Sequence, residues 1–150
     1  MKHRQTISAS RFRRTREAHR DETAQDYAEA ILSMTETGGE ARVRDLAVMM
    51  GVSHVTVTRI VARLRRDGIA TREPYRPVAL TPKGRRLALA CRDRHRVVLG
   101  FLLALGVPPG QAEIDAEGIE HHVSHATIAA LRRAQRSQLH PSSKAVTKSS

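Results

Sequence analysis

The sequence predicts a mainly α-helical fold in which a three-helix unit with a two-stranded hairpin comes first and an all-helical unit follows. Apolar residues recur at helical spacing between glycine stops, two short strand-like segments surround the turn PYRP, and helical spacing then returns. We expect the two units over residues 21–81 and 82–138. A basic disordered arm is expected at 1–20 and a disordered tail at 139–150, because both ends have little apolar content.

Composition excludes several classes of protein. The 150 residues include 26 Lys and Arg against 15 Asp and Glu, for a net charge of +11 and a pI near 11.3. Aromatic residues make up 3%, and Cys91 is the one cysteine, so an aromatic platform and a disulfide framework are both excluded. The longest apolar run, residues 97–107, is shorter than the about 20 residues of a membrane helix, and residues 1–20 lack a signal-peptide core. We expect a cytoplasmic protein with a polyanionic partner and no membrane association.

The charge is unevenly distributed along the chain. Residues 1–20 have a net charge of +6, whereas residues 111–130 have a net charge of −4 and contain no Lys or Arg. An acidic block is most often a solvated helix face, and the alternative is a site for a cation. A basic arm at 1–20 could add phosphate contacts to DNA, although disorder is the commoner explanation.

The first unit has three predicted helices. An apolar stripe over residues 21–37 ends at a glycine pair, and residues 43–50 (VRDLAVMM) form a short second helix. Ser53 is a natural N-cap for a third helix over residues 54–67. The two strands IATRE and VALT follow. A helix, a short helix, a turn, a helix and a hairpin are the layout of a winged helix-turn-helix.

The second unit is expected to be helical throughout. Thr81 and Pro82 open a long helix that runs through Leu105. Another helix is predicted over residues 110–123, and Ser124 caps a last helix that ends near residue 136.

The third helix and the hairpin have the features of a DNA-reading surface. The third helix presents Thr and Arg side chains opposite its apolar stripe, and the N-terminal end of such a helix contacts base edges. Two arginines flank the hairpin tip, where a wing meets the DNA backbone. The candidate DNA-binding residues are Ser53, His54, Val55, Thr56, Arg59, Arg63, Arg72 and Arg76. A solvated arginine face is the alternative, but the hairpin and the net charge favour double-stranded DNA.

Acidic residues and histidines form groups that together could hold a metal ion. One is an i, i+3 carboxylate pair on the first helix, one is an E-x-x-E-H sequence, and one is a histidine on the apolar stripe of the long helix. They are Asp26 and Glu29, then Glu117, Glu120 and His121, and finally His95. Each group alone is more often solvent-exposed or part of a core. Together they supply carboxylates and imidazoles without thiolate, a set that suits Mn²⁺ and, less selectively, Fe²⁺.

A zinc site is the competing interpretation. His121 and His125 have the i, i+4 spacing of many zinc ligands, but Ser124 is expected to start a new helix and so to turn His125 away. The chain has no H-E-x-x-H sequence, the defining feature of many metallohydrolases. We therefore do not expect an enzyme or a small-molecule substrate.

Two segments and the predicted winged helix-turn-helix resemble a known family. The string DAEGIEHHVS (115–124), the upstream segment RDRHRVVLGFLLALGV and the winged helix-turn-helix are similar to the diphtheria-toxin-repressor (iron-dependent-repressor) family and, within it, to the manganese-responsive transport regulators. The resemblance runs from about Arg16 to about Arg136. It implies that the metal ligands are Asp26, Glu29, His95, Glu117, Glu120 and His121. Iron-responsive relatives carry softer Met and Cys at two of these positions, so the resemblance favours Mn²⁺.

The resemblance also implies how such a protein works. It predicts a homodimer that forms through the C-terminal helices, binds a palindromic operator and represses manganese-uptake genes. One or two Mn²⁺ ions per subunit would fix the orientation of the DNA-binding lobes, and Fe²⁺ could substitute. Three alternatives stay open: an Fe²⁺-responsive repressor, a metal-independent winged-helix regulator, and a small dimetal enzyme, for which the sequence names no substrate cleft.

Overall fold

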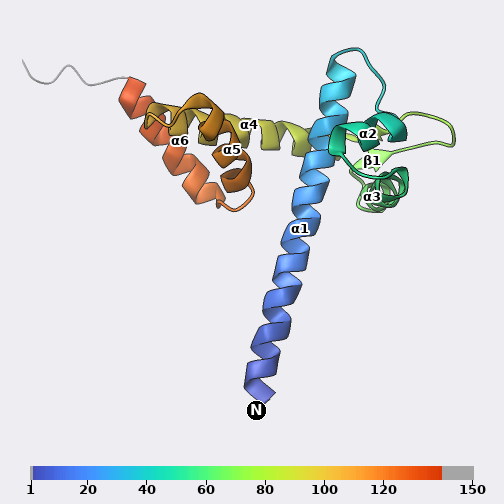
Figure 1. The fold of residues 1–150 in the computed structure, drawn as a ribbon, viewed down its shortest axis with the longest axis horizontal. Coiled ribbons are helices and arrows are strands. Elements are labelled where there is room, and N and C mark those ends of the chain that lie inside the picture. Colours follow the sequence, from blue (N-terminus) through green and yellow to red (C-terminus); the bar gives the residue numbers. More distant parts are fainter. Residues whose placement is uncertain (1, 140–150) are drawn as a thin grey trace, which may run out of the picture. The chain divides into compact units, whose positions relative to one another are not determined.

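The computed structural model describes residues 2–139, and within them the side-chain environments of residues 16–137. The predicted tail from residue 140 onward lies outside the described residues. Figure 1 shows a mainly helical chain with one short antiparallel hairpin, as the sequence predicts. The elements are α1 (Lys2–Glu36), α2 (Val43–Met50), α3 (His54–Arg66), β1 (Ala70–Thr71), β2 (Ala79–Leu80), α4 (Pro82–Ala104), α5 (Pro109–Glu120) and α6 (His125–Leu139).

The chain divides into two compact units, residues 1–91 and 92–150. The division falls inside α4, whereas the sequence analysis places it just before Pro82. The first turns of α4 belong with the first unit because Leu87 and Ala88 pack into its hydrophobic core. No single helix among residues 2–139 is long and apolar enough to cross a membrane.

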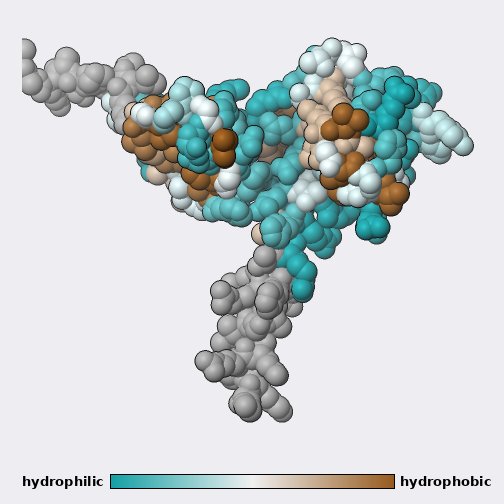
Figure 2. Space-filling model, in the orientation of Figure 1, coloured by the Kyte–Doolittle hydropathy of each residue, from teal (hydrophilic) through white to brown (hydrophobic). Residues whose placement is uncertain are grey.

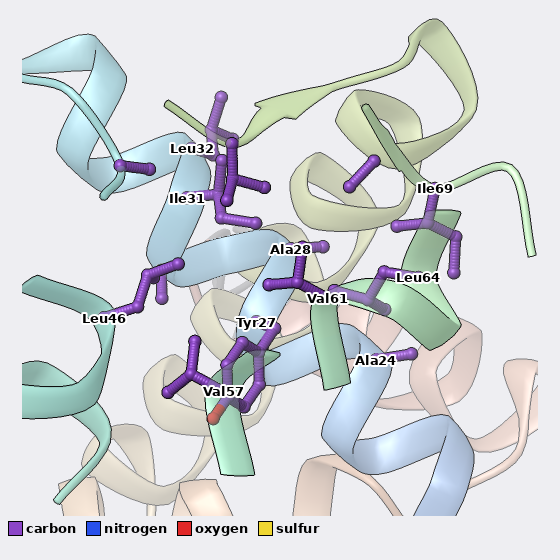
Figure 3. Close-up of a cluster of buried hydrophobic side chains, with 14 of the residues drawn as sticks. Ala24, Tyr27, Ala28, Ile31, Leu32, Leu46, Val57, Val61, Leu64 and Ile69 are labelled. Atoms are coloured by element: carbon purple, nitrogen blue, oxygen red, sulfur yellow. The ribbon is translucent and has the colours of Figure 1, made fainter. Parts of the chain in front are cut away.

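The core of the first unit is built from α1, α2, α3 and the hairpin (Figure 3). Tyr27 and Ile31 lie one turn apart on α1 and are buried, and Val57 and Leu64 on α3 are fully buried. The figure shows Tyr27 beside Val57. Each such side chain contributes about 1.5–3 kcal/mol when it is removed from water, so this unit has a sound core of its own.

The helix-turn-helix and its wing follow directly from local signals. The helices α2 and α3 meet at 109°, which is within the range of helix-turn-helix motifs. Gly51 ends α2 in the left-handed conformation, with φ of 64°. In the hairpin Ala70 pairs with Leu80, and a single bridge joins Ala41 to Val78. The predicted winged helix-turn-helix is confirmed.

The second unit comprises the C-terminal part of α4 with α5 and α6. Within the described part of the chain, Val97, Val98, Ala116 and Ile128 form its buried hydrophobic cluster, and Ala112 is buried as well. As predicted, Ser124 caps α6: its Oγ accepts a hydrogen bond from the Thr127 backbone N–H at 3.1 Å.

Two of the expected boundaries are wrong. The helix α5 ends at Glu120 rather than at Val123, because the chain must leave the helix before the cap that begins α6. At the other end, α1 begins at Lys2, where we expected a disordered arm. Residues 2–36 contain no Gly or Pro, so nothing stops the helix; few apolar residues suggest disorder but do not themselves break a helix.

Candidate nucleic-acid interface and metal centre

The N-terminal end of α3 is fixed by a side-chain cap. Ser53 Oγ accepts a hydrogen bond from the Thr56 backbone N–H at 3.1 Å and lies 2.9 Å from Thr56 Oγ1. Both hydroxyls are therefore engaged within the turn, where they hold the start of the helix. The two residues between them, His54 and Val55, are exposed, and Val55 keeps 67% of its surface accessible. This end of α3 can meet the edges of bases.

The arginines along α3 have different surroundings. Arg59 is exposed. Arg63, one turn further on, is half-buried, and its guanidinium donates a hydrogen bond to the Arg20 carbonyl oxygen of α1 at 3.2 Å. Arg59 is thus free to reach a DNA partner, whereas Arg63 ties α3 to α1.

The wing adds a second positively charged surface. A surface hollow is lined by Arg65 from the last turn of α3 and by Arg72, Glu73 and Tyr75 from the hairpin. Tyr75 is 98% exposed at the tip, and Arg76 is exposed there too. Arg65 was missed by the sequence analysis, although its place in the last turn before the wing was a usable signal.

In the second unit the structure brings three of the predicted metal ligands together. His95 Nδ1 lies 2.7 Å from Glu120 Oε2, and His121 Nε2 lies 3.5 Å from Glu120 Oε1. The Glu120 residue is only 6% exposed, and it is the buried charged residue among those described. The helix α4 supplies His95, the end of α5 supplies Glu120, and His121 is the residue at which α5 ends. A buried carboxylate is retained here because it has imidazole partners.

Glu120 contributes to the pKa of His95 within the group formed by His95, Glu120 and His121, which is called the cluster below. Burial alone would lower the pKa of the His95 imidazole, but hydrogen bonds to Glu120 and Glu113 and their negative charges outweigh it and raise that pKa. Arg94 holds the same turn, because its guanidinium donates to the Glu120 carbonyl oxygen at 3.2 Å.

One member of the cluster was missed and one predicted member lies apart. Glu113 Oε2 is 3.2 Å from His95 Nε2. It precedes Glu120 by seven residues, or two helical turns, so the spacing predicts that the two share a face of α5 but not that Glu113 contacts His95. The predicted ligand Glu117 is exposed on α5. His125, the rejected zinc ligand, begins α6 and is exposed.

The remaining predicted ligands belong to the first unit. On α1, Asp26 is exposed and Glu29 is half-buried, one turn apart. Between them Tyr27 points into the core, where burial and then the charge of Asp26 raise the pKa of its phenol. Among the described residues, no three His, Cys, Asp or Glu side chains are arranged as an ion would require. The donors nonetheless fit Mn²⁺ chemically, since they are carboxylate oxygens and imidazole nitrogens around a buried carboxylate.

The fold and these two surfaces define a winged helix-turn-helix protein with a carboxylate–imidazole cluster in a second, helical unit. Residues 21–78 match the family model of the iron dependent repressor N-terminal DNA binding domain, and residues 81–136 match that of the iron dependent repressor metal binding and dimerisation domain. The chain therefore belongs to the iron-dependent repressor family.

Named relatives and solved structures agree with this assignment. The chain is 48% identical over 121 residues to "Transcriptional regulator MntR" of Escherichia coli O6:H1. The aligned region covers 81% of this chain and 78% of that protein. It is 41% identical over 104 residues to "HTH-type transcriptional regulator MntR" of Listeria monocytogenes serotype 4a, covering 69% and 73%. A structure described as "Manganese-dependent transcriptional repressor complex with manganese" matches with a TM-score of 0.68 and 32% identity over 75% of this chain. The chain spans about half of that structure's length, 52%.

Proposed function

We propose that the protein is a Mn²⁺-dependent homodimeric transcriptional repressor that binds palindromic operators and controls manganese-uptake genes in the cytoplasm. The observation that carries the proposal is the buried Glu120 carboxylate, placed between two imidazoles in a chain whose other unit is a winged helix-turn-helix. The names of the similar proteins support both the metal and the regulatory role.

The DNA-binding residues divide by task. His54, Val55 and Thr56 at the start of α3, with Arg59 one turn on, would face the bases and neighbouring phosphates. Ser53 positions this end through its cap, and Arg63 holds α3 against α1. On the wing, Arg72 and Arg76 would contact the backbone, where their charge favours phosphate.

The six predicted ligands would hold the metal. They are Asp26, Glu29, His95, Glu117, Glu120 and His121, and they would accommodate one or two Mn²⁺ ions per subunit, with Fe²⁺ as a substitute. When bound, Mn²⁺ supplies positive charge that offsets repulsion among the carboxylates and ligand bonds that join groups from both units.

Some of the proposed ligands are already placed for this metal-dependent change in orientation. His95 and His121 already lie beside Glu120, so three of the proposed ligands are neighbours before metal binds. Because Asp26 and Glu29 belong to the DNA-binding unit, their engagement would fix the orientation of that unit. A two-fold dimer would then present two α3 helices to half-sites about 34 Å apart, or a multiple of this spacing.

The deciding experiment is operator binding with and without metal. Fluorescence anisotropy with a labelled operator should show affinity about 5–150-fold higher in saturating Mn²⁺ than in EDTA, the range of typical allosteric coupling. A parallel anaerobic titration with Fe²⁺ tests the substitution. Equal affinities in Mn²⁺ and EDTA would refute metal dependence.

Replacement of the buried carboxylate tests the metal centre directly. Glu120→Ala should abolish Mn²⁺ activation of operator binding, because His95 and His121 lose the group that holds them together. Isothermal titration should show Mn²⁺ affinity reduced at least about tenfold, while circular dichroism stays helical. Asp115→Asn on the same helix is the matched control, since that carboxylate bonds to Gln111 at 2.7 Å. Unchanged Mn²⁺ affinity in Glu120→Ala would remove this residue from the site.

Replacement on α3 tests the DNA-reading surface. Arg59→Ala should weaken operator binding by about 1–3 kcal/mol in both Mn²⁺ and EDTA, because the lost contact belongs to DNA and not to metal. The control is Arg133→Ala, an exposed arginine of α6. Footprints and affinities equal to those of the parent would show that a different face of α3 reads DNA.

A further inference from the structure

We propose that the N-terminal half of α1 is a basic arm that contacts DNA phosphates beyond the half-site read by α3. The inference rests on the proposed function as a DNA-binding protein and extends its footprint. Residues 2–16, called the basic arm below, contain six basic residues and no acidic one. The basic residues are Lys2, Arg4, Arg11, Arg13, Arg14 and Arg16.

The backbone of the basic arm is helical and continuous with the core of the first unit. The single helix α1 runs from Lys2 to Glu36, and its later turns carry the buried residues Tyr27 and Ile31 (Figure 1). At 1.5 Å per residue, the 15 residues of the basic arm extend about 20 Å from that anchored part. Such a length spans about six base pairs of DNA at 3.4 Å each.

The basic arm leaves the unit beside the DNA-reading helix. The Arg63 guanidinium of α3 donates to the Arg20 carbonyl oxygen at 3.2 Å, so α3 contacts α1 four residues after the arm ends. Arg59, one turn before Arg63, is exposed on α3. A hollow lined by Glu17 and Arg20 of α1 and by Asp67 after α3 marks the same junction. The charge at this junction is mixed, since Asp21 and Lys83 line the hollow too, so the uniformly basic segment begins only with the arm itself.

The chemistry of the basic arm favours a polyanion over a packing partner. Its two large apolar residues, Ile7 and Phe12, are not at the three- or four-residue spacing of a helix face that packs. The acidic residues of α1 begin only at Glu17, where charges are mixed and His19 pairs with Glu22 at 3.2 Å. A uniformly basic segment beside a DNA-reading helix matches phosphates, with no sequence preference of its own.

The salt dependence of operator binding tests this proposal. The arm variant carries Arg11→Gln, Arg13→Gln and Arg14→Gln, because glutamine keeps helix propensity while it removes charge. The matched control carries Arg96→Gln, Arg133→Gln and Arg136→Gln, three exposed arginines of the second unit. Operator affinity is measured in saturating Mn²⁺ from low to high salt. Each lost phosphate contact lowers the slope of log affinity against log salt by about 0.9.

The expected result distinguishes a contact made by the arm from a general effect of lower net charge. The arm variant should have a slope shallower by about 2 and bind about tenfold more weakly at low salt, whereas the control stays close to the parent. Trimming the operator to its palindrome should remove the difference between parent and arm variant. A chain that lacks residues 2–14, checked by circular dichroism, repeats the test if the substitutions disturb folding.

The outcomes distinguish the two proposals. If the arm variant and the truncated chain keep the parent's slope while Mn²⁺ still activates binding, the arm contact is wrong and the proposed function stands. If Mn²⁺ does not activate the parent, the proposed function fails, and the slopes measured in EDTA still decide whether the arm contacts DNA.

Discussion

Two glycines of α4, one in each unit, differ in what surrounds them. A Cβ on Gly84 in the first unit would lie 2.0 Å from the Ile69 carbonyl oxygen, which is backbone. A Cβ on Gly100 in the second unit would lie 2.8 Å from Gln135 Nε2, the end of a flexible side chain. An added Cβ would therefore have to displace backbone in the first unit, which is costly, but only a flexible side chain in the second.

The hydrophobic cores of the two units also differ in size. Within the described residues the hydrophobic cluster of the first unit has sixteen buried members and that of the second has four. Both units also leave large apolar side chains exposed: Leu103, Leu105, Ile114 and Ile119 in the second, and Val48, Met49, Val52, Val55, Tyr75 and Leu89 in the first. Figure 2 shows hydrophobic surface over both units. Because the buried cluster of the second unit is so small, we expect its exposed apolar side chains to be the ones that a second copy covers.

The largest effect is expected at Gly84. Gly84→Ala forces the start of α4 away from Ile69, where Thr81 and Lys83 also tie α4 to the residues before the wing. We expect a loss of about 3 kcal/mol in the free energy of unfolding, the upper part of the range for overpacked sites. Thermal and urea denaturation measure this loss.

Gly100→Ala is the matched control for that prediction. Here Gln135 loses its hydrogen bond to the Val97 carbonyl oxygen, which is 2.7 Å long, at a cost of about 1 kcal/mol. The gain in helix propensity from Gly to Ala is about 1 kcal/mol, so the net change should be near zero. Equal losses at Gly84 and Gly100 would contradict the contrast between the units.

The exposed apolar surface of the second unit predicts the dimer. Ile114 is 65% exposed, and Ile114→Glu should weaken dimerisation at least about tenfold, because a charge would be buried at the interface. Val48→Glu on α2 is the control, since Val48 is 84% exposed on the first unit and should leave the dimer intact. Analytical ultracentrifugation over a concentration series measures both. A dimer unaffected by Ile114→Glu would place the interface elsewhere.

Local signals allowed much of the fold to be predicted from the sequence. The helix α2 has the predicted bounds, Val43–Met50, because its stripe is short and Gly51 stops it. Ser53 and Ser124 begin the helices that they were expected to cap. Each of these features depends on residues within one or two turns of one another, which is the range over which spacing and capping are informative.

The remaining features depend on contacts between distant residues. Arg63 contacts Arg20 across 43 positions, and His95 contacts Glu113 across 18, so neither contact follows from helical spacing alone. The length of α1 was missed because the apolar stripe on which we relied ends long before the helix does. Of the six proposed ligands, the structure places His95, Glu120 and His121 beside one another, although in the sequence only the family resemblance links His95 to the other two. The sequence did not distinguish the buried Glu120 from the exposed Glu117.

The smallest predicted effects come from the two serine caps, which make the same contact in different units. Ser53 Oγ and Ser124 Oγ each accept a backbone N–H three residues on at 3.1 Å, and each lies near a threonine hydroxyl, at 2.9 and 3.0 Å. Ser53→Ala and Ser124→Ala should each lower the free energy of unfolding of the local unit by about 1 kcal/mol. Hydrogen exchange, which resolves the two units, measures them separately.

The caps should differ in their functional consequences. Ser53→Ala loosens the end of α3 that meets DNA, so it should weaken operator binding in both Mn²⁺ and EDTA. Ser124→Ala loosens the start of α6, three residues after His121, so it should lower Mn²⁺ affinity while operator binding in EDTA stays as in the parent. If Ser124→Ala instead weakens operator binding equally in both conditions, the second unit acts on DNA affinity without metal, and the division of roles between the units is wrong.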